Sequence, residues 1–396
     1  MSSSNKVHLL SFFRHQSFDW VWKVIIIPFV ATRLCWLLVG YYATGNYLPN
    51  PTYAKYASRG FYLTHFFPVD IFSRWDSGEY FSIITRGYAP SSDIHTVYSN
   101  IAFFPLYPYL VKSLGWIGFS LPDGFYVAFG VILSNLFFLA AAVLLYKFIL
   151  EVLDFSELVA SRSIGLLFVF PTGFIFSCFY TESLFLFLLI LTLTFALKDK
   201  WKWASLSAFF ILLTRSQGLV VWGILFFLYL EKKKWNIRKI DVNIGWLLLS
   251  PIGLLAHLYY LYRLTGEPLA PFVAMTAWGR ANTTILTSLW ENLSAPWLDV
   301  YKIDLMFSIV FILISILIFV KWPVKSIGLL SLALSVMPIA SGLLVSTSRY
   351  LLIVIPVFIF LAEKIHNQSG YDFLRAIFFT LQIIYFAGWV NYYWIV

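Results

Sequence analysis

Long, mostly apolar runs recur from one end of this sequence to the other, and they restrict its possible folds more than any other feature. Three examples are 125–150, 184–197 and 307–320. A helix needs about 20 apolar residues to cross about 30 Å of hydrocarbon, whereas a spanning strand shows alternating polarity over about ten residues. These runs do not alternate, so they predict helices. The chain of 396 residues has room for roughly ten such crossings.

Charge and cysteine content agree with a membrane protein. Only 12% of the residues are charged, against about 25% in soluble domains. The formal net charge of +9 comes from short basic clusters between the apolar runs, a pattern that sets membrane orientation, so we expect no nucleic-acid partner. Cys35 and Cys178 both lie inside apolar runs, where they predict neither a disulfide framework nor a metal site.

The apolar pattern predicts an all-α, polytopic protein that forms a single transmembrane domain over 1–396. About eleven transmembrane helices are expected, near 24–42, 125–148, 162–180, 183–197, 201–214, 218–231, 243–262, 304–320, 326–346, 350–362 and 373–394.

The distribution of lysine and arginine orients these helices. With a cytoplasmic N-terminus, the short segments on that side are basic, as at 198–202 and 232–239. The two long segments, 43–124 and 263–303, then lie outside and contain few basic residues for their length. Within the first of them, 101–119 is apolar, but its prolines, Lys112 and aromatic residues favour a helix lying at the interface over a twelfth span.

Four short polar segments interrupt this pattern, and ionisable groups at membrane depth are costly unless they are paired or functional. The segments are SRWDSGEYF (73–81), FYTES (179–183), TRSQG (214–218) and STSRY (346–350). Each also has an ordinary structural interpretation. These are a capping Asp76 with a salt bridge to Arg74 or Arg86, Glu182 at a helix N-terminus, a hairpin turn at Arg215, and interfacial snorkelling by Arg349.

The predicted orientation puts Asp76, Glu182, Arg215 and Arg349 on one side of the membrane. A carboxylate can take a proton from a hydroxyl group, and the planar guanidinium group of arginine can bond two phosphate oxygens at once. This combination is what glycosyl transfer from a lipid phosphate requires.

Six motifs follow one another in an order found in a known family. They are Arg74-Trp75-Asp76 with Tyr80-Phe81, AFFPLYP (102–108), FPT (170–172), YTESLF (180–185), TRSQG (214–218) and SRY (348–350). Together they resemble the GPI mannosyltransferase 2 family (PIG-V type) and its bacterial and archaeal relatives. The sequence departs from the family at Gln217, which is inserted where the family usually has Arg-(Ser/Asn)-Gly.

This resemblance implies a GT-C fold, a helical membrane glycosyltransferase whose active site faces away from the cytoplasm. Such enzymes take a sugar from a polyprenyl-phosphate donor, and their catalytic acid is typically in the first outer loop, the place that Asp76 occupies. We therefore expect an inverting glycosyltransferase, mannosyltransferase-like, without a cofactor or metal. The expected site comprises Asp76 as catalytic residue, Arg349 and Arg215 at the donor phosphate, Arg74, Trp75, Glu79, Glu182 and Tyr350 in supporting positions, and Trp278 and Arg280 at the acceptor.

The expected partners are membrane lipids, the polyprenyl-phosphate-sugar donor and a glycan or glycolipid acceptor. A prokaryotic cell (inner) membrane is the expected location, with the endoplasmic reticulum membrane as the alternative. Interfacial packing is an alternative role for the tryptophans of 263–303. A lipid or glycan transporter or flippase would also bury charge in a helical bundle, but it should show inverted repeats, and none is visible. A non-catalytic subunit of a membrane glycan-assembly complex is a third possibility.

Overall fold

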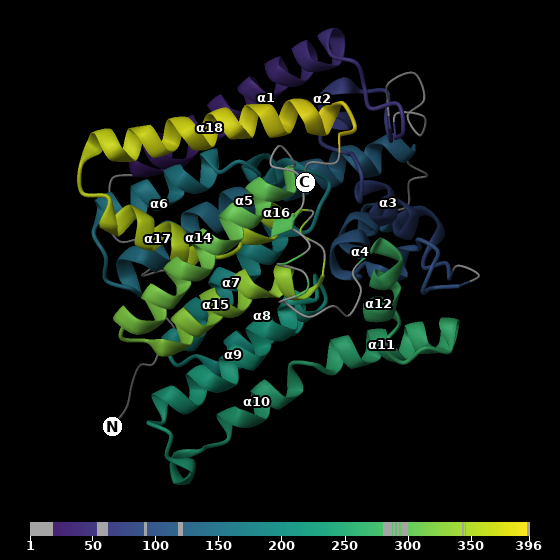
Figure 1. Ribbon diagram of the computed structural model, residues 1–396. Helices are drawn as coiled ribbons and strands as arrows, with labels where there is room; N and C mark the ends of the chain where they lie inside the picture. The colour runs from purple at the N-terminus through teal and green to yellow at the C-terminus, as the bar shows by residue number, and fades with distance from the viewer. Residues whose placement is uncertain are drawn as a thin grey trace.

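The computed structural model describes residues 19–53, 62–90, 93–117, 122–279, 287, 290, 293–294, 300–342, 344 and 346–393. Among these residues the regular secondary structure is entirely helical (Figure 1). The α-helices are α1 (Ile27–Asn46), α2 (Phe67–Asp70), α3 (Ser77–Arg86), α4 (Leu106–Lys112), α5 (Asp123–Glu151), α6 (Glu157–Val169), α7 (Glu182–Leu197), α8 (Trp201–Leu212), α9 (Gln217–Lys232), α10 (Asn243–Leu249), α11 (Ile252–Thr265), α12 (Ala270–Val273), α14 (Val300–Lys321), α15 (Lys325–Ala340), α16 (Thr347–Leu351), α17 (Ile355–Lys364) and α18 (Gln368–Val390).

Five helical segments of the described chain are long and apolar enough to cross a membrane. They are Val21–Asn46, Asp123–Glu151, Asn243–Thr265, Lys302–Lys321 and Gln368–Val390. α7 and α15 are apolar but shorter. The chain therefore has the architecture of a multi-pass membrane protein, whereas eleven full-length spans are not found in the part that the structure describes.

Prolines account for much of this difference, because proline disfavours helical geometry in the residue before it. The helix expected over 162–180 ends at Val169, and Phe170, which precedes Pro171, has an extended ψ of 142°. The helix expected over 350–362 is two helices, α16 and α17, and Pro356 lies in the first turn of the second. The helix expected over 326–346 runs through Pro338 and ends at Ala340, so its end is not explained in this way.

Aromatic side chains fill the centre of the bundle. The ring of Phe170, just after α6, meets four others edge-on, with centroid distances between 5.3 and 5.7 Å, and its own side chain is fully buried. The partner rings belong to Phe307 and Phe311 of α14, Phe358 of α17 and Phe378 of α18. Edge-to-face contacts of this kind stabilise beyond the area they bury, so this cluster holds the C-terminal helices against α6.

The two ends of the bundle differ in character. Basic connections meet at one end, where Lys232 pairs with Asp199 at 2.8 Å and Glu231 accepts the backbone N–H groups of Lys325 and Ser326. The short helices α3, α4 and α12 gather at the other end (Figure 1). The described residues 101–117 contribute the seven-residue α4 and a 3-10 turn over Ser113–Ile117, each of which is too short to cross a bilayer.

Candidate functional site

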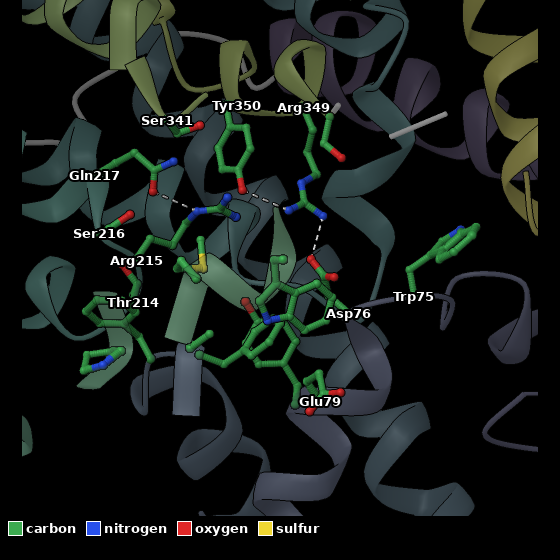
Figure 2. Close-up of a pocket in the computed structure, with 18 of the residues that line it drawn as sticks. Trp75, Asp76, Glu79, Thr214, Arg215, Ser216, Gln217, Ser341, Arg349 and Tyr350 are labelled. Carbon is green, nitrogen blue, oxygen red and sulfur yellow. Dashed lines mark hydrogen bonds and ion pairs between the residues drawn. The ribbon is translucent and has the colours of Figure 1, made fainter. Parts of the chain in front are cut away.

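A cavity of about 690 Å³ opens at the end of the bundle that carries α3 and α12. This volume lies within the range of small-molecule sites. Its walls come from α3, the turn before α9, the segment after α11, the C-terminal end of α15 and α16 (Figure 2). Residues separated by more than 250 positions in the chain therefore face one space. The predicted site residues that line it are Trp75, Asp76, Glu79, Arg215, Trp278, Arg349 and Tyr350.

Asp76 is held at the entrance of α3 by its backbone. Its N–H group donates to the hydroxyl oxygen of Tyr180 at 3.1 Å, and that hydroxyl donates to the carbonyl of Arg74 at 3.2 Å. Trp75, between them, adopts a φ of 54°, which is unusual for a residue with a bulky side chain. The Tyr180 hydroxyl thus stabilises a strained backbone that turns the Asp76 carboxylate into the cavity.

The Asp76 carboxylate pairs with Arg349 across the cavity. The guanidinium Nη1 of Arg349 lies 2.9 Å from Oδ2 of Asp76, and the dashed line in Figure 2 marks this contact. The Asp76 side chain is 21% exposed, so it still faces the cavity. The described residues contain no salt bridge from Asp76 to Arg74 or Arg86, so this part of the ordinary structural interpretation is wrong.

The buried carboxylate of Glu182 forms ion pairs with both arginines. Its Oε1 atom forms an ion pair with Arg215 and lies 3.3 Å from Nε of Arg349, and its side chain is 1% exposed. Buried charges are tolerated only when opposite charges and hydrogen bonds compensate their desolvation. Asp76, Glu182 and the two arginines supply equal numbers of positive and negative charges, so the cluster is formally neutral.

Neighbouring polar and aromatic groups fix the direction of each guanidinium. Arg215 donates to the Thr181 hydroxyl at 3.1 Å and to the Gln217 side-chain oxygen at 3.3 Å. The Tyr350 ring lies between the arginines in Figure 2, with its centroid 5.0 Å from the Arg215 guanidinium carbon and 5.2 Å from that of Arg349. Both cations therefore point into the cavity in defined orientations.

A second buried carboxylate holds the short helix that carries Arg349. Asp304 of α14 is 1% exposed and accepts the backbone N–H of Ser348 at 3.1 Å. The Thr172 hydroxyl donates to the Ser348 carbonyl at 3.0 Å, which ties α16 to the FPT motif. Sequence analysis did not single out Asp304 as a site residue, although an acidic residue at the start of an apolar run is a signal that could have found it.

The turn that carries Arg215 is tight because of Gly218. A Cβ atom at this position would lie 2.7 Å from the carbonyl oxygen of Ile211 and 2.9 Å from the Cα atom of Leu212. Only glycine allows α9 to start this close to the end of α8. Gln217, the residue inserted relative to the family pattern, lines the cavity and bonds to Arg215, and it was not predicted as a site residue.

Two predicted site residues lie outside the cavity wall. Glu182 lies behind the arginines, as described. Arg74 is 1% exposed and pairs with Asp70, whose carboxylate also accepts three backbone N–H groups from 62–64. Arg74 therefore braces the loop that precedes Asp76. Arg280 lies outside the described residues.

Glu79 faces the cavity one helical turn after Asp76. Burial, and then the nearby Asp76 carboxylate, raise the pKa of Glu79, with Arg86 acting in the opposite direction. In the described part of the chain its carboxylate has no ion pair or side-chain hydrogen bond. No group of three or more potential metal-binding side chains occurs there either.

We expect Glu79→Gln to raise the melting temperature near pH 7, and the gain to disappear near pH 4. A raised pKa means that the folded chain holds this proton more tightly than the unfolded chain, whose value is about 4.3. The ionised side chain therefore destabilises the fold as the pH rises through the folded pKa, whereas below the unfolded value both states are protonated. Melting curves from pH 4 to 8 test this, with the exposed Glu157→Gln as control. A gain independent of pH would contradict it.

Comparisons with known proteins add little at the level of sequence. No family model and no curated protein matches the chain. Among solved structures, it is similar to the crystal structure of the Archaeoglobus fulgidus oligosaccharyltransferase, with 14% sequence identity and a TM-score of 0.42. The match covers 92% of this chain and 53% of the other, so the chain spans about half the length of that protein. A similarity this distant identifies neither a family nor an activity.

Proposed function

We propose that this chain is an inverting glycosyltransferase. It moves a sugar from a polyprenyl-phosphate-linked donor to a hydroxyl group of a lipid- or glycan-linked acceptor on the extracytoplasmic face. The observation that carries the proposal is the meeting of Asp76, Arg215 and Arg349 in one cavity, with both arginines held by the buried Glu182.

The chemistry needs a base at one side of the sugar and positive charge at the other. The acceptor hydroxyl oxygen attacks the anomeric carbon while its proton passes to the Asp76 carboxylate. The bond between the anomeric carbon and the phosphate oxygen breaks, and its electron pair leaves with the lipid phosphate. Attack from the face opposite the leaving group inverts the anomeric configuration.

Arg349 and Arg215 stabilise the leaving phosphate. Charge develops on the departing oxygen, and guanidinium groups that are already oriented in the cavity stabilise that charge without reorganising. Arg349 forms ion pairs with Asp76 and Glu182. A donor phosphate at Arg349 competes with Asp76 for the guanidinium, which frees the carboxylate to accept a proton. Two cations suffice for a monophosphate, so the proposal requires no metal.

The cavity also has an apolar side suited to an isoprenoid chain. Leu219 and Val220 of α9 face it, as do Met337 and Ala340 of α15. Apolar side chains beside the arginines match a donor that combines a phosphate with a hydrocarbon tail. Mannose as the transferred sugar is supported by the resemblance of the six motifs to the GPI mannosyltransferase 2 family. The bacterial and archaeal relatives of that family support a prokaryotic cell membrane as the location.

The direct test is sugar transfer by the purified chain in lipid vesicles. Radiolabelled polyprenyl-phosphate-mannose is supplied with short alkyl glycosides as acceptors, and labelled product is extracted and counted. Turnover by the purified chain alone would also exclude a non-catalytic subunit. Vesicles that flip the labelled donor between leaflets without forming product would instead favour the transporter alternative.

We expect Arg349→Lys to raise the KM for the donor about tenfold to a hundredfold, and Arg349→Ala to raise it at least as much. Lysine keeps the charge but cannot form two parallel bonds to phosphate oxygens, and hydrogen bonds between charged groups contribute about 1.5–3 kcal/mol. The control is Arg375→Lys in α18, where the arginine is 45% exposed. An unchanged donor KM in folded Arg349 variants would remove this arginine from the phosphate site.

A further inference from the structure

The proposed mechanism leaves part of the cavity unused. Glu79 lines it, and its carboxylate has no hydrogen bond or ion pair in the described chain. A partly buried carboxylate without a partner is costly, because desolvation is not compensated. Its neighbour Asp76, by contrast, is bound to Arg349. The Glu79 carboxylate can therefore accept hydrogen bonds from a molecule in the cavity.

Aromatic rings form a wall of the same cavity. The Trp278 ring lies 4.7 Å from Tyr98 and 5.6 Å from Phe103, measured between centroids, and all three residues line the cavity. The indole Nε1 of Trp278 is buried and has no hydrogen-bond partner among the described residues. An indole N–H normally finds a partner when it is buried. The Nε1 atom itself is out of reach of a molecule in the cavity, so what the wall offers is apolar ring faces.

Glu79 and the arginines lie on different sides of Asp76. In Figure 2 the Asp76 carboxylate lies between Arg349 and Glu79, with Arg215 and Tyr350 on the side of Arg349. Asp76 and Glu79 are three residues apart at the start of α3, so they share a helix face. A molecule that reaches Asp76 from the side opposite the phosphate therefore passes Glu79.

A sugar ring has the chemistry that matches this part of the cavity. It presents C–H groups on its faces, which pack on aromatic rings, and hydroxyl groups at its rim, which donate to a carboxylate. Ligand sites generally combine apolar walls with a few polar groups that fix orientation. A simple alcohol, whose single hydroxyl group is needed at Asp76, would leave the Glu79 carboxylate without a donor.

We propose that Glu79, Trp278 and Phe103 form a subsite for a sugar ring of the acceptor. Glu79 accepts a hydrogen bond from one ring hydroxyl, and another hydroxyl of the same ring reaches Asp76. The identification of this sugar as the acceptor rests on the proposed function, whereas sugar binding at Glu79 and Trp278 does not. Glu79 and Trp278 then determine that the acceptor is a glycan-bearing molecule and not a plain lipid alcohol.

Binding can be measured without catalysis. The full chain is placed in phospholipid nanodiscs free of glycoside detergent and titrated with octyl α-mannoside, 1-octanol or octylamine below their micelle concentrations. Saturation-transfer difference NMR reports which protons of each probe contact the protein. We expect contact at the sugar ring protons of the mannoside and weaker binding of 1-octanol.

Substitutions of Glu79 and Trp278 should change the affinity for the mannoside. Glu79→Ala and Trp278→Ala should each weaken mannoside binding about tenfold or more. The first removes a charge-assisted hydrogen bond, and the second removes an aromatic ring on which the sugar packs. Glu79→Gln should bind more tightly than Glu79→Ala, since its amide oxygen still accepts from a hydroxyl group. The controls are Glu157→Ala and Trp203→Ala, two exposed side chains outside the cavity.

Two outcomes would overturn the inference. One is equal binding of 1-octanol and the mannoside, with no effect of the Glu79 and Trp278 variants. The other is preferential binding of octylamine that Glu79→Gln abolishes, which would make the subsite one for a cation. A failure of the proposed function alone gives a different result. Mannoside binding would then still depend on Glu79, but no sugar would be transferred from the polyprenyl-phosphate donor.

Discussion

Asp76→Asn is expected to lower the rate of sugar transfer by about 10²- to 10⁴-fold, the range that a positioned proton acceptor contributes. Asparagine has nearly the same shape and can still accept a hydrogen bond from Arg349, but it cannot take the acceptor proton. Within the described part of the chain, the substitution also leaves Glu182 as the one carboxylate paired with the two arginines. The donor KM should therefore stay the same or fall.

This combination of a lower kcat and an unchanged or lower donor KM separates a lost base from a damaged site. Asp372→Asn in α18, a substitution at a side chain 53% exposed, is the matched control. Melting curves establish that the Asp76 variant is folded. Transfer by Asp76→Asn within a few fold of the wild-type rate would mean that another group accepts the proton, and Glu79 would be the next residue to test.

Glu182→Ala should produce the largest loss of stability among the site variants, about 3–5 kcal/mol. Its carboxylate is the shared partner of Arg215 and Arg349, whose side chains are only 9% and 8% exposed. Without it, the two guanidinium groups share one buried cavity wall with Asp76 as their remaining counter-ion. Glu182→Gln should lose less, because an amide oxygen still accepts hydrogen bonds.

The thiol of Cys178 offers a measure of unfolding, since this residue is fully buried. Labelling by a thiol-reactive dye during heating, in a Cys35→Ser background, reports when the bundle opens. Inorganic phosphate should raise the melting temperature of Glu182→Ala more than that of wild type, because an anion that binds the folded state stabilises it. Glu157→Ala is the control, and equal melting temperatures of Glu182→Ala and wild type would contradict the expectation.

The sequence predicted that four ionic residues share one side of the membrane, but it did not predict which of them contact one another. The orientation rule placed Asp76, Glu182, Arg215 and Arg349 on one side, and the structure brings all four together. The partner of Asp76 could not be derived, because Arg74 is two residues away in sequence and Arg349 is far away. Arg74 instead pairs with Asp70, one helical turn before it.

Helix ends were predicted least well. Apolar composition continues through Pro171 and Pro356, so the pattern predicted continuous helices where the backbone breaks. The break before Pro171 turns Thr172 towards Ser348, and the break before Pro356 leaves α16 as a five-residue helix held by Asp304. These interruptions position Arg349, so the departures from regular helix are part of the site.

The amino-acid sequence alone determined that the chain is helical and embedded in a membrane, because apolar length and charge placement are properties of local composition. It also indicated which polar segments share a side. Only the tertiary structure decided that Glu182 bridges two arginines, that Arg349 faces Asp76, and that the Glu79 carboxylate has no ion pair within the described residues. Such pairings depend on how separate helices pack, and side-chain distances between segments hundreds of residues apart are not encoded in any local pattern.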